Sequence, residues 1–187
     1  MMAVETEIKL RLREGPEPVL ALLEQHGFRP TGPRQLETDQ IFDLPTGELR
    51  QSGRLLRLRS AGERWLVTYK GPADQATHKS REEIETNVSD GSAFAQILAA
   101  LGYQPSFAYE KFRTTFAIAG EEGIVTLDET PMGDFLELEG PGYWIDKTAH
   151  RLGFEPADYI TSTYPLLYAE YRKAHPTVPR DMKFHLP

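Results

Sequence analysis

The stretch Val4-Glu5-Thr6-Glu7-Ile8-Lys9-Leu10 decides the fold expected for this chain. Successive side chains of a β-strand point to opposite faces, so Glu5, Glu7 and Lys9 share one face and the apolar residues share the other. The stretch therefore predicts a strand with one buried apolar face and one densely charged face. For a single segment of this kind, a solvated surface strand is the ordinary explanation.

The same alternation of charged and apolar residues returns in later segments. The Glu-x-Glu spacing recurs at 83–85 and 137–139, and basic residues copy it at 57–59 and 111–113. The charged phase of the expected strands comprises Glu5, Glu7, Lys9, Arg57, Arg59, Lys70, Arg81, Glu83, Glu85, Lys111, Arg113, Asp128, Glu137 and Glu139. Recurrence on several strands favours a common charged interior, with a ladder of cross-strand ion pairs as the structural alternative.

Composition excludes several classes of protein. A length of 187 residues with 40% hydrophobic content is enough for one domain with a sizeable core. The absence of cysteine excludes a disulfide framework and a sulfur-ligated zinc site. The net charge of −7 and the lack of a long apolar run argue against nucleic-acid and membrane partners. We therefore expect a cytoplasmic protein, and a homodimer is one open assembly.

Glycine, proline and capping residues divide the chain into about eight short strands and three or four helices. Strands are expected at 4–10, 38–44, 55–59, 64–70, 81–85, 109–118, 123–129 and 134–139. Helices are expected at 19–26, 93–101, 144–152 and 159–173, and Pro165 should make the last one start late. Residues 29–35 and 73–79 read as loops, and 176–187 as an irregular C-terminal tail behind a single domain of residues 1–175.

These elements predict an α+β fold, a closed eight-stranded antiparallel β-barrel with helices packed outside. Such a barrel buries the apolar faces beneath helices and has an interior wide enough for one small ligand. Charges on its inner face must be paired or bind a ligand, because burying them alone is costly. Arginine and lysine match phosphate oxygens, whereas clustered carboxylates match Mg²⁺ or Mn²⁺.

Taken in order, these segments resemble the CYTH superfamily, whose members are also called triphosphate tunnel metalloenzymes. The resemblance begins with the ExExK motif of residues 5–9 and covers nearly the whole chain. It continues through residues 39–43, 56–59, 69–72, 81–85, 110–113, 126–128 and 133–139. It implies an eight-stranded tunnel whose basic residues grip a triphosphate and whose acids hold one or two divalent cations, Mg²⁺ or Mn²⁺.

Carried over by position, the resemblance assigns roles to individual residues. The implied metal ligands are Glu5, Glu7, Asp128, Glu137 and Glu139. The implied substrate ligands are Lys9, Arg57, Arg59, Lys70, Lys111 and Arg113, with Glu83 and Glu85 lining the same tunnel. Lys9, Lys70, Arg57 and Arg59 are the predicted catalytic residues.

Three candidate functions are open, of which the resemblance implies the first two. The first is hydrolysis of inorganic triphosphate or an organic triphosphate such as thiamine triphosphate or ATP. The second is a class IV adenylate cyclase, although the His-Phe pair that such cyclases carry before the first acidic motif is absent from Met1-Met2-Ala3-Val4. The third is a non-catalytic polyphosphate or nucleotide sensor. Hydrolysis is preferred because no residue in the sequence identifies itself as an adenine reader.

Two finer expectations concern ionisation. No histidine lies on the charged phase, so the proton of an attacking water passes to a carboxylate, to metal-bound hydroxide, or to a lysine such as Lys9 or Lys70 with a lowered pKa. The last two routes predict a rate that rises above roughly pH 8. In addition, Glu137 and Glu139 are expected to repel each other when no metal is bound.

Overall fold

The computed structural model describes residues 3–75 and 77–184 of the chain. Its strands are β1 (Ala3–Leu12), β2 (Arg29–Pro30), β3 (Gln35–Asp43), β4 (Leu55–Ala61), β5 (Arg64–Lys70), β6 (Asp74–Gln75), β7 (Lys79–Val88), β8 (Gln104–Ala117), β9 (Ile124–Thr130) and β10 (Gly133–Glu139). Its helices are α1 (Glu17–Gln25), α2 (Glu48–Gln51), α3 (Gly91–Ala100), α4 (Gly142–Arg151) and α5 (Tyr164–Ala174), with a short 3₁₀ helix at Pro156–Asp158. No helix in these ranges is long and apolar enough to cross a membrane.

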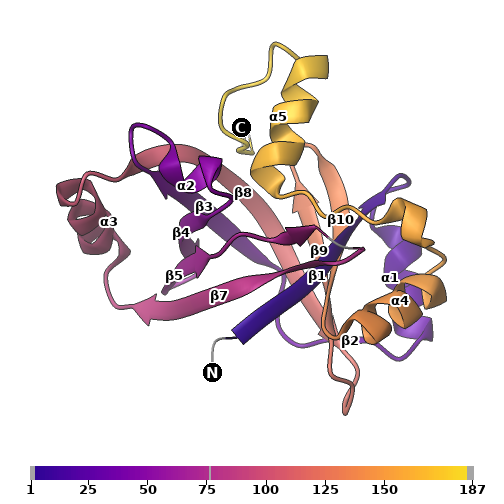
Figure 1. Ribbon diagram of the computed structural model, residues 1–187. Helices are drawn as coiled ribbons and strands as arrows, with labels where there is room; N and C mark the ends of the chain where they lie inside the picture. The colour runs from indigo at the N-terminus through magenta and orange to yellow at the C-terminus, as the bar shows by residue number, and fades with distance from the viewer. Residues whose placement is uncertain (1–2, 76, 185–187) are drawn as a thin grey trace.

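Eight strands form a closed antiparallel barrel in the order β1-β10-β9-β8-β3-β4-β5-β7, and β7 returns to β1 (Figure 1). β1 closes the ring because its two halves have different partners: residues 3–7 pair with β7, and residues 7–12 pair with β10. The closed eight-stranded barrel predicted from the sequence is confirmed. The very short β2 and β6 lie outside the ring, paired to β8 and β7.

Helices cover the apolar outer face of the barrel and leave the charged phase inside. Leu23 of α1 and Ile145 of α4 pack on Ile8 and Leu136 of the sheet, and all four are fully buried. On another side of the barrel, Leu98 of α3 packs against Leu58 of β4. In Figure 1, α3 lies at the side of the barrel opposite to α1 and α4.

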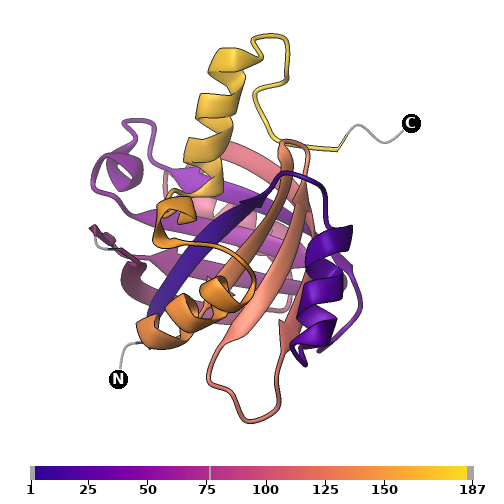
Figure 2. The same ribbon diagram turned by 90° about the vertical axis from the view of Figure 1, so that its right-hand side faces the viewer.

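One end of the barrel is filled by aromatic residues beneath α5, which stands upright above the strands in Figure 2. Tyr164 and Tyr168 of α5 pack there with Tyr109, Phe135 and Met182. Along β8 the phase that contains Tyr109 thus changes from aromatic at Phe107 and Tyr109 to charged at Lys111 and Arg113. The backbone of Met182 bridges that of Tyr109, so the C-terminal tail is attached to the barrel although it forms no regular element between residues 176 and 184. Residues 185–187 of the expected tail lie outside the described ranges, as do Met1 and Met2.

The structure corrects several local expectations. The expected loop at 29–35 contains β2, and β3 already begins at Gln35. The expected loop at 73–79 contains β6, and Lys79 is the first residue of β7. The short helix α2 follows the turn at 45–47, because Asp43 accepts hydrogen bonds from the backbone of Leu49 and Arg50. The last helix starts only at Tyr164, consistent with the late start expected from Pro165.

Candidate active site

The barrel encloses a cavity of about 500 Å³ whose wall is formed largely by charged side chains. Strands β1, β4, β5, β7, β8 and β10 and the first residues of α5 contribute to the wall. The cavity brings together the predicted residues Glu5, Glu7, Lys9, Arg57, Arg59, Lys70, Glu83, Glu85, Lys111, Arg113, Glu137 and Glu139. Asp128 lies behind this wall.

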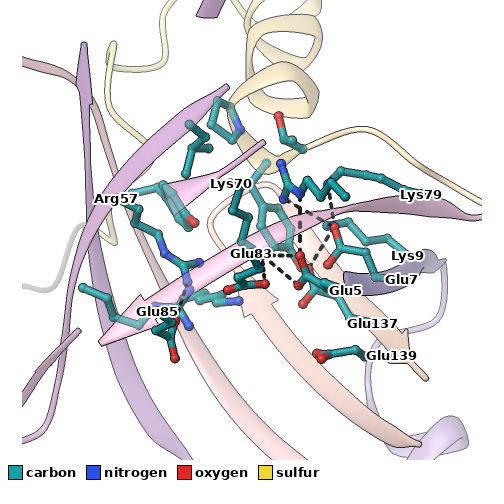
Figure 3. Close-up of a pocket in the computed structure, with 18 of the residues that line it drawn as sticks. Glu5, Glu7, Lys9, Arg57, Lys70, Lys79, Glu83, Glu85, Glu137 and Glu139 are labelled. Carbon is teal, nitrogen blue, oxygen red and sulfur yellow. Dashed lines mark hydrogen bonds and ion pairs between the residues drawn. The ribbon is translucent and has the colours of Figure 1, made fainter. Parts of the chain in front are cut away.

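Lys9 lies between two carboxylates in the wall of the cavity, on the right in Figure 3. Its Nζ is 3.3 Å from Glu7 Oε1 and 3.0 Å from Glu137 Oε1, and Arg113 Nη2 pairs with the other oxygen of Glu137. Burial alone would lower the pKa of Lys9, but Glu137 and Glu7 outweigh burial and raise that pKa above its ordinary value. The expectation that Lys9 has a lowered pKa is therefore wrong.

The two carboxylates have pKa values below the ordinary range. Burial would raise the pKa of Glu137, yet Lys9, Arg113 and Lys111 hold it well below its usual value. The pKa of Glu7 is likewise lowered, because Lys9 and Lys79 outweigh burial and the nearby Glu137. Both groups are therefore ionised and already paired with cations in this arrangement.

Asp128 is fully buried and holds three neighbours. It accepts hydrogen bonds from Lys111 Nζ at 2.8 Å, from Arg113 Nε at 2.6 Å and from the Tyr164 hydroxyl at 2.7 Å. Tyr164 was not expected at the site, because its position follows from the packing of α5 and not from the strand alternation. The role of Asp128 as a metal ligand stays a prediction. In the structure, Asp128 orients Lys111 and Arg113, two residues predicted to bind phosphate.

Arg57 and Arg59 share a second buried acidic partner that the sequence reading did not include among site residues. Arg59 Nε lies 2.8 Å from Asp39 Oδ1, and Arg59 Nη1 lies 2.9 Å from Glu37 Oε2. Arg57 Nε lies 3.4 Å from Asp39 Oδ1 and, within the described ranges, has no hydrogen-bond partner. A buried guanidinium nitrogen of this kind remains able to donate to a ligand oxygen. The Glu37-x-Asp39 spacing on a strand was the available signal.

In the acidic part of the cavity, burial and neighbouring carboxylates favour the neutral forms of Glu5 and Glu139. Lys70 Nζ lies 2.5 Å from Glu5 Oε2 and 3.0 Å from Glu83 Oε2. Even so, burial and the nearby Glu7 raise the pKa of Glu5. Glu139 keeps an exposed surface, yet its partial burial, Glu5 and Glu7 raise its pKa to about 7. Figure 3 shows Glu139 below the paired cluster, with no dashed line to it.

A cation bound beside Glu5 and Glu139 would favour their ionised forms, although the described residues do not form a ready metal centre. Within residues 3–75 and 77–184, no group of three or more histidine, aspartate or glutamate side chains is arranged to hold a metal ion. The carboxylates instead form ion pairs with lysine and arginine side chains. Oxygen ligands of this type suit Mg²⁺ or Mn²⁺, and a divalent cation between Glu5 and Glu139 would relieve their mutual repulsion.

Two basic residues of β7 complete the wall and were not among the predicted site residues. Lys79 is buried, and its Nζ lies 2.5 Å from Glu7 Oε1. Arg81 Nε lies 3.6 Å from Glu5 Oε2. Burial outweighs Glu7 and lowers the pKa of Lys79 to about 8. Strand alternation places Arg81 on the charged phase. The same alternation, extended two residues toward the N-terminus, would also have included Lys79.

Comparisons with known proteins agree with this geometry. Residues 3–143 match the family model described as the CYTH domain. A protein of Methanocaldococcus jannaschii named "Putative adenylate cyclase" is 30% identical over 136 residues, which cover 73% of this chain and 76% of that protein.

Solved structures share the fold at low sequence identity. A "putative adenylate cyclase" of Vibrio parahaemolyticus has a TM-score of 0.79 and 21% identity, with 90% of this chain and 99% of that chain covered. A Hippeastrum "putative adenylyl cyclase", described as having a dominant triphosphatase activity, has a TM-score of 0.64 and 16% identity, with coverage of 91% and 96%. These likenesses establish the common barrel.

Proposed function

The chain belongs to the CYTH domain family, and from this premise we propose that it is a divalent-metal-dependent hydrolase of triphosphates. The observation that supports the proposal most directly is the division of charge within one cavity. Arg57, Arg59, Lys111 and Arg113 line the basic part, whereas Glu5 and Glu139 crowd the acidic part and have raised pKa values. A complex of metal and triphosphate presents both the anion and the cation that such a cavity would bind.

The chain's own residues would hold and orient the substrate. Arginine and lysine donors placed around a phosphate chain neutralise the negative charge of the transferred group and align it for in-line attack. Glu5, Glu7, Glu137 and Glu139 are the residues that would hold the cation, and Asp128 would keep Lys111 and Arg113 in place. A bound Mg²⁺ or Mn²⁺ would supply further charge neutralisation at the phosphate oxygens.

Cyclisation of ATP is the second candidate, supported by the name of the Methanocaldococcus jannaschii relative. A cyclase must also hold adenosine so that the ribose 3′ oxygen reaches the α-phosphorus. Among the described residues that line the cavity, the aromatic ones are Tyr109 and Tyr164, which are only 5% and 4% exposed. Neither offers an open ring face to a base, and this favours hydrolysis.

Parallel assays with inorganic triphosphate and ATP test the proposal. With Mg²⁺ or Mn²⁺ present, we expect phosphate release from inorganic triphosphate to exceed formation of cyclic AMP from ATP, and we expect EDTA to stop the release. Phosphate, pyrophosphate and cyclic AMP should be measured in the same samples. Conversion of ATP to cyclic AMP and pyrophosphate at the higher rate would support the cyclase, and binding without any turnover would support a sensor.

Replacement of Arg57 by alanine should lower kcat/KM for inorganic triphosphate by about 10- to 100-fold, because a charge-assisted hydrogen bond contributes about 1.5–3 kcal/mol. Asp39 keeps Arg59 as its partner, so the fold should survive. Arg54→Ala is the matched control, because Arg54 is exposed and donates to Ser52. Unchanged kinetics accompanied by lower thermal stability would show that Arg57 serves only in a structural ion pair.

A further inference from the structure

His78 lies in the turn between β6 and β7, outside the cavity, and the next residue, Lys79, enters the cavity. The pairing of Glu7 with Lys79 is the last of the β1–β7 ladder. On its other side Lys79 pairs with Gln75 of β6, but β6 is only two residues long, so this end of β7 has few backbone contacts of its own. The position of Lys79 therefore depends on what holds the preceding turn.

The turn is attached to α4 and to the segment that follows it. His78 Nε2 lies 2.7 Å from Asp146 Oδ1, and the Tyr159 hydroxyl donates to the same oxygen at 3.0 Å. The rings of His78 and Tyr159 lie 6.0 Å apart. A Cβ added to Gly142, the first residue of α4, would lie 3.1 Å from the His78 ring, so the ring rests directly on the helix backbone. We call His78, Asp146 and Tyr159 the turn clasp.

On the inner side, Lys79 has unused capacity to bind an anion. Its ammonium group has three donors, and the contact with Glu7 Oε1 accounts for one of them. Lys79 lines the same cavity as Lys9, Arg57 and Arg81. Figure 3 shows Lys79 across from Lys70, with Glu5 and Glu7 between them. An oxygen of a phosphate chain in the cavity would give the ammonium group a second, charge-assisted partner.

We propose that His78 is a positioning residue, whose turn clasp holds Lys79 at the cavity wall so that the Lys79 ammonium group binds an oxygen of a bound triphosphate. This inference rests on the proposed function and adds Lys79 as a substrate ligand. The side chain of His78 does not itself reach the substrate, and its effect passes through Lys79 alone. That restriction makes the role of His78 separable from a general contribution to stability.

Steady-state kinetics with inorganic triphosphate and Mg²⁺ at pH 7 test the proposal. Lys79→Met should raise KM at least tenfold, because a charge-assisted contact is lost. His78→Ala should raise KM about fivefold while kcat stays within about twofold, because the Lys79 ammonium group is displaced and not removed. His78→Gln should restore most of the affinity, since its amide group can still donate to Asp146.

A double-mutant cycle distinguishes positioning from a structural effect. Added to Lys79→Met, His78→Ala should cause no further rise in KM, because the residue through which it acts is already gone. An additive rise would overturn the proposal. His150→Ala is the control, because His150 belongs to the same helix as Asp146, lies 3.4 Å from Glu155 and is 80% exposed. Its KM should equal that of the wild type, and a rise equal to that of His78→Ala would also overturn the proposal.

Binding measured by calorimetry separates this proposal from the proposed function. If the wild-type protein binds inorganic triphosphate without cleaving it, the hydrolase is contradicted, and the same variants then test His78 through Kd instead of KM. In that case we expect Kd to be lowest for the wild type, higher for His78→Ala and highest for Lys79→Met. Equal Kd values for wild type and Lys79→Met would overturn the role of Lys79 as a ligand.

Discussion

Asp128→Asn is expected to lower the free energy of unfolding by about 3–5 kcal/mol, because removing one partner of a buried ion pair leaves uncompensated charge in the interior. Asp128 is fully buried and accepts from Lys111, Arg113 and Tyr164. Asparagine keeps one acceptor oxygen but loses the negative charge that balances the two cations. Urea unfolding at pH 7 measures the loss, and turnover should fall with it because two phosphate-binding candidates lose their support.

Glu129→Gln provides a matched control on the same strand. Glu129 follows Asp128 directly but faces outward, where it pairs with Arg34 at 2.6 Å; the two side chains are 26% and 48% exposed. An exposed ion pair contributes about 0–1 kcal/mol, so this variant should stay close to the wild type. A loss below about 1 kcal/mol for Asp128→Asn as well would indicate that water already screens the interior of the barrel.

Glu137→Gln and Glu139→Gln are expected to change stability in opposite directions although the two residues share one motif. Glu137 lies 3.0 Å from Lys9 and also pairs with Arg113, so its replacement should cost about 3 kcal/mol. Burial and Glu5 raise the pKa of Glu139, and the expected repulsion from Glu137 adds only a smaller contribution. Burial would raise the pKa of Glu137 as well, but Lys9 and Arg113 hold it below its ordinary value. Both variants should lose metal-dependent turnover.

The pH dependence of unfolding follows from the pKa of Glu139, which rises from 4.5 to about 7 on folding. Between these values the folded protein retains a proton that the unfolded chain has lost. The free energy of unfolding contributed by this group therefore falls as pH rises through this window and stays unfavourable above pH 7. In EDTA at pH 8, Glu139→Gln should be more stable than the wild type by about 1 kcal/mol, a value reduced by solvent screening.

The sign for Glu137 is the reverse. Its pKa is lowered on folding, so its stabilising contribution is present above the ordinary glutamate pKa and is lost as the pH falls below that value. With EDTA present, urea titrations at pH 5 and pH 8 measure the effect for Glu139→Gln, and urea titrations at about pH 3 and pH 5 measure it for Glu137→Gln. If Glu139→Gln destabilised the protein at pH 8, the unfavourable contribution expected from ionised Glu139 would be contradicted.

Strand alternation predicted the barrel and its inward charges because it is a local property of the chain. A period of two assigns each side chain to a face. Eight expected strands, seven of them with charges on one face, leave a closed barrel as the arrangement that buries the other face. This reasoning placed Glu5, Lys9 and Arg113 in one cavity, as the structure shows. It missed Lys79, the first residue of β7, because the polar segment 73–79 is typical of a loop.

Residues supplied by tertiary packing could not be predicted in this way. Tyr164 reaches Asp128 only because α5 stands at the end of the barrel. The pairing of Lys9 with Glu137, which raises the pKa of Lys9, depends on the register between β1 and β10. Sequence spacing gives the face on which a charge lies, whereas its ion-pair partner depends on which strands are neighbours and in what register.

The closure of the barrel by its first strand has a consequence for folding. β1 pairs with both β7 and β10, and Glu7 is opposite Glu139 in the register, so these contacts join positions separated by most of the chain. Such non-local pairing slows folding, because the entropy of closing a long loop is lost before the contacts form. During synthesis β1 is made before the other strands of the barrel, and it cannot pair with β10 until that strand has been made. Until β10 is available, the charged side chains of the future cavity remain hydrated. Their charge then has to keep the unpaired edge of β1 from pairing with strands of other chains.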